Sequence, residues 1–168
     1  DIWKSTDLSL GTGLPLWRPE GADASAWSFS ARAIEATSAG AARYVGHGGA
    51  DPSGSIVDTY VHGYPQSIRE HIRDAKPALA VGDLRVTGRC EPAPDCASLT
   101  LTIDEGQLQH RFVFPGPSAS AEERVRIESG PSAGQPGPRI ALAKLGPLAA
   151  GARVGFAVEN LDDRLALY

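Results

Sequence analysis

Residues 99–114 read LTLTIDEGQLQHRFVF and decide the fold class of the chain. Leu99, Leu101 and Ile103 alternate with polar residues, and the same two-residue rhythm returns after the Gly-containing connection at 104–107. Successive side chains of a β-strand point to opposite faces, so the pattern predicts two strands that each bury one face. Their short connection predicts that they pair as antiparallel neighbours.

The same alternation recurs along the second half of the chain. It is present at 84–87, 125–127, 140–142, 154–158 and 165–167, and each run is bounded by Gly, Pro or Asp. Strands with one apolar face need a facing layer, and the crossover helices of a parallel sheet are missing from the pattern. The sequence therefore predicts an all-β fold, an antiparallel β-sandwich of the jelly-roll type.

The first half of the chain is less regular. Short strands are predicted at 27–29, 33–36 and 42–45. A single short helix is predicted at 67–75, where Ser67 and Glu70 form a capping box. The Gly- and Pro-rich stretches of the second half are too short to be interdomain linkers, so we expect one β-sandwich domain over 1–168.

Composition narrows the range of partners. The chain of 168 residues has 16 Lys plus Arg against 20 Asp plus Glu, a net charge of −4. An acidic chain without basic runs is a poor ligand for nucleic acid, so we expect no nucleic-acid partner. No apolar run approaches the ~20 residues that span a bilayer. Met is absent and the chain stops inside a strand-like run, so we expect a fragment of a longer protein.

The two cysteines flank a Pro-rich segment. Cys90 and Cys96 enclose Glu-Pro-Ala-Pro-Asp between two strand-like runs. This placement predicts a disulfide that closes a hairpin and indicates an oxidising compartment, although two reduced thiols are the alternative. Two cysteines without a nearby pair of histidines cannot complete a zinc site.

The strongest polar cluster lies on the strand-like run 55–62. Alternation places Asp58, Tyr60 and His62 on one side, where a carboxylate, a phenol and an imidazole could line a binding face. The alternative is a solvated sheet face that carries one hydrogen-bonded pair. His110 lies on the apolar side of its strand, and we expect a hydrogen-bonded core residue there.

The acidic connection before the last strand offers oxygen ligands. Asn160, Asp162 and Asp163 could contribute to a calcium site, since calcium prefers carboxylate and carbonyl oxygens. Asn and Asp also form turns by bonding nearby backbone amides, and we favour that interpretation. We predict no metal site and no cofactor. No Gly-x-Ser-x-Gly elbow, phosphate loop or His-Glu-x-x-His motif is present, so we predict no catalytic residue in the chain.

The order of segments resembles a family. The run IVDTY (56–60), VGDLRV (81–86), the following Leu-x-Leu-x-Ile strand and the ending FAVENLDDRLALY (156–168) resemble a β-sandwich insertion in large bacterial signal peptidase I-like proteins. DIWK (1–4) and LWRP (16–19) resemble the start of that insertion. The ending is also similar to concanavalin A-like and laminin-G-like modules, where it leads into the last strand.

The resemblance implies a membrane-anchored parent protease with a Ser-Lys dyad that cleaves signal peptides. The Ser-Met-x-Pro box of that family is missing here, so no catalytic residue carries over. The chain would then be a non-catalytic insertion in the periplasm or at the cell surface, tethered through segments outside it. Its partners would be the rest of its parent chain and an envelope polysaccharide or peptide.

Two other functions fit the predicted fold. A concanavalin A-like carbohydrate-binding module would line a groove with Asp58, Tyr60, His62 or an exposed Trp. A glycoside hydrolase would need two carboxylates facing each other across a groove. The acids on the predicted strands are scattered, which disfavours the hydrolase.

Overall fold

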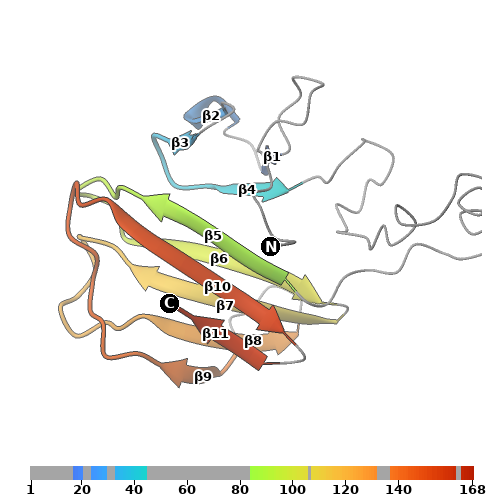
Figure 1. Cartoon of the computed structure of the whole chain (residues 1–168). Helices are drawn as coiled ribbons and strands as arrows, with labels where there is room; N and C mark the ends of the chain where they lie inside the picture. Colours follow the sequence, from blue (N-terminus) through green and yellow to red (C-terminus); the bar gives the residue numbers. More distant parts are fainter. Residues whose placement is uncertain are drawn as a thin grey trace, which may run out of the picture. The chain divides into compact units, whose positions relative to one another are not determined.

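The structure is a computed structural model of an all-β chain with antiparallel sheets (Figure 1). It describes residues 17–20, 24–29, 33–44, 84–105, 107–131, 137–161 and 164–168. Over these ranges there is no α-helix, and the predicted helix 67–75 lies outside them. No helix in the described part is long and apolar enough to cross a membrane. The chain divides into two compact units, Asp1–Val81 and Gly82–Tyr168; the expectation of one domain stays a prediction.

The first unit contains two small antiparallel pairs. Strand β1 (Trp17–Glu20) pairs with β4 (Ala41–Tyr44), and β2 (Trp27–Phe29) pairs with β3 (Ile34–Ala36) after the short 3-10 helix η1 (Ala24–Ala26). The predicted strands at 27–29, 33–36 and 42–45 are therefore confirmed within a residue or two. Trp17 lies opposite Tyr44, and their rings pack edge to face with centroids 5.6 Å apart. Such pairs stabilise two-stranded ribbons that have little other packing.

The second unit contains a four-stranded sheet. Its strands are β6 (Ser98–Glu105), β7 (Leu108–Pro115), β8 (Arg126–Pro131) and β9 (Arg139–Leu142), in the order β6-β7-β8-β9. The antiparallel pair predicted from 99–114 is confirmed: Leu99 lies opposite Phe114, and Leu101 opposite Phe112. The register of β8 with β9 shifts between Ile127 and Glu128.

A three-stranded sheet completes the unit. Its strands are β5 (Leu84–Cys90), β10 (Val154–Leu161) and β11 (Arg164–Leu167), in the order β11-β10-β5. Strand β10 lies in the middle, and Val158 faces Val86 on one side and Leu167 on the other. Ala157 and Val158 of this central strand are buried.

Side chains of both sheets share one hydrophobic cluster. Its buried members are Ile103, Phe112, Phe114, Val125, Ile127 and Val158. Partly buried side chains that pack against it include Leu84, Val86, Phe156, Leu165 and Leu167 of the three-stranded sheet. Phe112 and Val158 are fully buried, at 0% exposure. Burial of each such side chain contributes about 1.5–3 kcal/mol, so the cluster is the main stabilising feature of this unit.

The cysteine segment corrects one prediction. Cys90 and Cys96 are free thiols, and the predicted disulfide is not formed. Strand β5 pairs with β10 and β6 pairs with β7, so the strands that flank the Pro-rich segment belong to different sheets. The segment is a connection between sheets, whereas the prediction of a disulfide assumed a hairpin.

Candidate functional site

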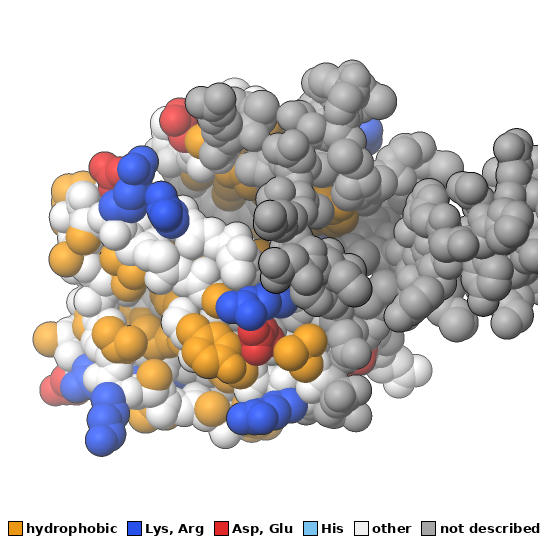
Figure 2. Space-filling view, viewed as in Figure 1, with side chains coloured by type: hydrophobic (Ala, Val, Ile, Leu, Met, Phe, Trp, Pro, Cys, Tyr) orange, Lys and Arg blue, Asp and Glu red, His pale blue; other side chains and the backbone are white. Residues whose placement is uncertain are grey.

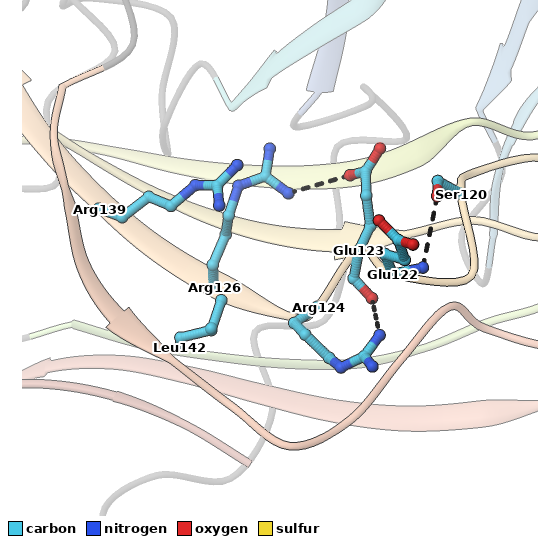
Figure 3. A pocket seen from close by; sticks show the side chains of 7 residues that line it. All are labelled: Ser120, Glu122, Glu123, Arg124, Arg126, Arg139 and Leu142. Carbon is cyan, nitrogen blue, oxygen red and sulfur yellow. Dashed lines mark hydrogen bonds and ion pairs between the residues drawn. The ribbon is translucent and has the colours of Figure 1, made fainter.

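A shallow depression of about 190 Å³ lies beside β8 and β9 (Figure 3). We call it the arginine depression; it is lined by Ser120, Glu122, Glu123, Arg124, Arg126, Arg139 and Leu142. On the face shown in Figure 2, basic side chains lie in separate small groups among hydrophobic and acidic ones. Three arginines, Arg124, Arg126 and Arg139, line the depression.

Arg126 is held in position by two carboxylates. Its Nε–H donates to Glu128 Oε1 over 2.7 Å, and its Nη1 donates to Glu123 Oε2 over 3.3 Å. Arg111 donates from Nη1 to the other oxygen of Glu128, Oε2, over 3.1 Å. Glu128 is 5% exposed, so both of its oxygens have a charged partner in a poorly solvated place. The result is a guanidinium with little freedom at the wall of the depression.

Arg139 has no such partner. It lies opposite Glu128 in the pairing of β8 with β9, where an ion pair would be expected. Both oxygens of Glu128 are already bonded to Arg111 and Arg126. No hydrogen bond or ion pair joins Arg139 to any residue in the described part of the chain. Figure 3 shows its guanidinium pointing toward that of Arg126.

The loop between β7 and β8 forms the other wall. The backbone N–H of Glu122 donates to Ser120 Oγ over 3.4 Å, and that of Glu123 donates to the carbonyl of Ser120 over 2.9 Å. Arg124 donates from Nη1 to the carbonyls of Ala121 and Glu123. These local bonds define a turn that brings two glutamates and a serine to the same rim.

The lining defines what the depression can bind. Guanidinium groups donate hydrogen bonds in a planar fork that fits a carboxylate or another oxyanion. Carboxylates such as Glu122 accept hydrogen bonds from hydroxyl groups, and Ser120 can donate or accept. The depression therefore suits a ligand that carries hydroxyl groups together with an anionic oxygen pair.

A second polar cluster joins the two sheets. Asn160 Nδ2 donates to Glu105 Oε2 over 2.7 Å, and the same oxygen lies 3.4 Å from His110 Nε2. Ser129 Oγ lies 3.0 Å from His110 Nδ1. Ser129, His110 and Glu105 thus follow one another as a hydroxyl, an imidazole and a carboxylate, the three groups of the catalytic triad in serine hydrolases. Here, however, His110 is 6% exposed, Asn160 is 1% exposed, and neither lines the arginine depression. We interpret the cluster as a hydrogen-bonded closure of the core, which confirms the prediction for His110.

Most of the site residues predicted from the sequence are not among the residues that the structure describes. Asp58, Tyr60, His62, Asp162 and Asp163 lie outside the described residues. The sequence predicts Asn160 in the turn before the last strand, but it lies within β10. Its side chain bonds Glu105 because the strand extends further than the sequence pattern indicates. No cluster of three or more His, Cys, Asp or Glu in the described part of the chain is arranged to hold a metal.

The cysteines do not belong to either cluster. Burial raises the pKa of the Cys90 thiol, the charge of neighbouring Cys96 raises it further, and a backbone hydrogen bond lowers it. A raised thiol pKa reduces the thiolate fraction and hence the nucleophilicity of Cys90 at neutral pH.

Sequence reasoning missed the arginine depression. In the sequence, Arg124 and Arg126 alternate with the apolar Val125 and Ile127, which puts the arginines on the opposite face of that strand. The pairing of Arg139 with Glu128 depends on the irregular register of β9, for which the sequence carried no signal. No family model, no curated protein and no solved structure matches the chain.

Proposed function

We propose that residues 84–168 form a two-layered antiparallel β-sandwich and that the chain is a non-catalytic module that binds a saccharide. The shared hydrophobic cluster supports the two layers, because both sheets contribute their apolar faces to it. The observation that carries the function is the arginine depression, in which guanidinium, carboxylate and hydroxyl groups converge beside Leu142. A saccharide needs such planar polar partners for its hydroxyl groups.

A binding role agrees better with the polar residues than catalysis does. Asn160 bonds Glu105 across the two sheets, His110 lies 3.4 Å from the same carboxylate, and both His110 and Asn160 are buried. A hydrolytic pair of carboxylates would have to face each other across an open groove. In the depression, Glu123 bonds Arg126, and Glu122 lies next to it in the chain, so the two acids share one rim.

The proposed place of the module comes from the sequence resemblance. We place it in the periplasm or at the cell surface, as an insertion in a signal peptidase I-like membrane protease, with an envelope polysaccharide as the ligand. The sequence on both sides of the chain in its full gene tests this placement. A transmembrane helix followed by a Ser-Met-x-Pro box, with a lysine segment nearby, would support it. Flanks without these features would refute the parent without affecting the binding proposal.

Titration of the full chain with a panel of envelope oligosaccharides tests the binding function. Calorimetry is expected to find at least one saccharide that binds, and Glu122→Ala should weaken that binding because a hydroxyl acceptor is lost. Asp95→Ala is the matched control, since Asp95 is an exposed acid outside the depression. A panel without any binder, or equal effects of the two variants, would refute the function.

A further inference from the structure

We infer that the arginine depression recognises the carboxylate of an acidic saccharide, and that Arg139 is the residue that selects it. This inference rests on the proposed function, because it names the ligand class of the same site. The starting observation is that Arg139 lacks any acceptor among the described residues while lining the depression beside Arg126. Two guanidinium groups that point toward each other repel, and an anion seated between them would remove that repulsion.

The charge of the lining favours a single negative charge. Arg124, Arg126 and Arg139 contribute three positive charges, and Glu122 and Glu123 contribute two negative ones, which leaves one positive charge. Arg111 and Glu128, which do not line the depression, carry one charge of each sign and leave this sum unchanged. A singly charged carboxylate balances the net charge of the depression, whereas a doubly charged phosphate would leave an excess negative charge there.

The two arginines have different tasks. Arg126 is fixed by Glu123 and Glu128, so its position is set before any ligand arrives. Arg139 retains its full set of donors and can present the planar fork that matches two carboxylate oxygens. Holding one partner in advance lowers the ordering cost of binding. Ser120 and Glu122 on the opposite rim are placed to bond ring hydroxyl groups of the same sugar.

A matched set of ligands tests the inference on the full chain. The probes are a galacturonic acid trisaccharide, its methyl ester, and a neutral trisaccharide of the same linkage, each titrated by calorimetry. The free acid is expected to bind most tightly. Arg139→Gln should weaken the acid about tenfold, because the bond between two charged groups is lost, and should leave the ester nearly unchanged. Arg139→Lys should fall between, since it keeps the charge without the fork.

Controls separate the inference from the proposed function. Arg153→Gln removes an exposed arginine outside the depression and should change nothing. Circular dichroism shows whether each variant keeps its sheets. If the acid and the ester bind equally well, or if Arg139→Gln leaves acid binding intact, the inference is refuted while saccharide binding stands. A sulfated trisaccharide that binds as tightly as the acid would refute carboxylate selectivity. If no saccharide binds at all, both proposals fail.

Discussion

Asn160 Nδ2 donates a 2.7 Å hydrogen bond to Glu105 Oε2 and thereby joins strand β10 of one sheet to strand β6 of the other. Asn160 is 1% exposed, and the accepting carboxylate also lies near His110. A hydrogen bond to a charged acceptor in a poorly solvated place is stronger than one at the surface. The bond therefore fixes the end of the core where apolar residues give way to polar ones.

Replacing Asn160 with alanine is expected to destabilise the chain. Asn160→Ala removes a buried side chain and its hydrogen bond to the Glu105 carboxylate, and the free energy of unfolding should fall by about 1–3 kcal/mol. Urea unfolding followed by circular dichroism measures the change. The control is Gln109→Ala, which removes an exposed amide that donates to Asp104 over 2.9 Å and should cost under about 0.5 kcal/mol. Equal losses of stability in the two variants would show that the bond between the sheets contributes no more than an exposed one.

Replacing a core residue is expected to cost much more stability than replacing an exposed residue of similar type. Phe112 is at the centre of the hydrophobic cluster with 0% exposure, whereas Leu145 is 67% exposed. Phe112→Ala should lower the free energy of unfolding by about 3–5 kcal/mol, because a cavity remains where the ring was. Leu145→Ala should change it by less than about 0.5 kcal/mol. If the two variants unfold at the same urea concentration, residue 112 is not in the core.

The ion pairs of Glu128 are expected to contribute strongly to the stability of the folded chain. Its two oxygens bond Arg111 and Arg126, and its side chain is 7% exposed. Glu128→Gln leaves Arg111 without its anion and Arg126 with Glu123 alone, and it should cost about 3–5 kcal/mol, the usual effect of removing one member of a buried ion pair.

The exposed pair Glu20–Arg43 provides the control for that variant, since both side chains are about half exposed. Glu20→Gln should cost at most about 1 kcal/mol, because water and salt screen the pair. Thermal unfolding of both variants at low and high salt separates the two cases. A Glu128 variant as stable as the Glu20 variant would contradict the buried network.

Local patterns predicted the strands but not the contacts between them. Alternation identified β6, β7 and β10, and it placed Ile103, Phe112 and Val158 on apolar faces, as the structure confirms. The residue types of Asn160, Asp162 and Asp163 predicted a turn that included Asn160, because Asn and Asp are typical of turns. The bond from Asn160 to Glu105 spans 55 residues, and such pairings leave no trace in a short window. The position of Arg139 depends in the same way on an irregular strand pairing.

A close backbone approach predicts that Gly116 cannot be replaced. A Cβ at this position would lie 2.1 Å from the carbonyl oxygen of Cys96, which is backbone and cannot rotate away. Gly116→Ala should therefore lower the free energy of unfolding by about 1–3 kcal/mol or prevent folding. Gly155→Ala is the control, since its nearest atom would be 4.0 Å away. Chemical unfolding compares the two variants, and equal stability of Gly116→Ala and Gly155→Ala would refute the close approach.

Cys90 predicts a dependence of stability on pH. Folding raises the pKa of this thiol above its ordinary value of 9.0, chiefly through burial and also through Cys96. A group with a raised pKa stabilises the folded chain below its unfolded pKa and loses that contribution as pH rises through the folded pKa. The wild type should therefore lose more stability than Cys90→Ala between neutral and strongly alkaline pH. Comparing the two chains cancels the loss expected from Tyr44, whose pKa is also raised by burial.

Cys96→Ala separates the two causes of that shift. Burial of Cys90 remains in this variant, but the charge of the neighbouring thiolate is gone, so the pKa of Cys90 should fall while staying above its ordinary value. The rate of alkylation by iodoacetamide, followed against pH, reports this pKa because only the thiolate reacts. In unfolding experiments the same variant should lose less stability with rising pH than the wild type does. An unchanged alkylation profile would mean that Cys96 does not act on Cys90, and an ordinary pKa in the variant would mean that burial has no part in the shift.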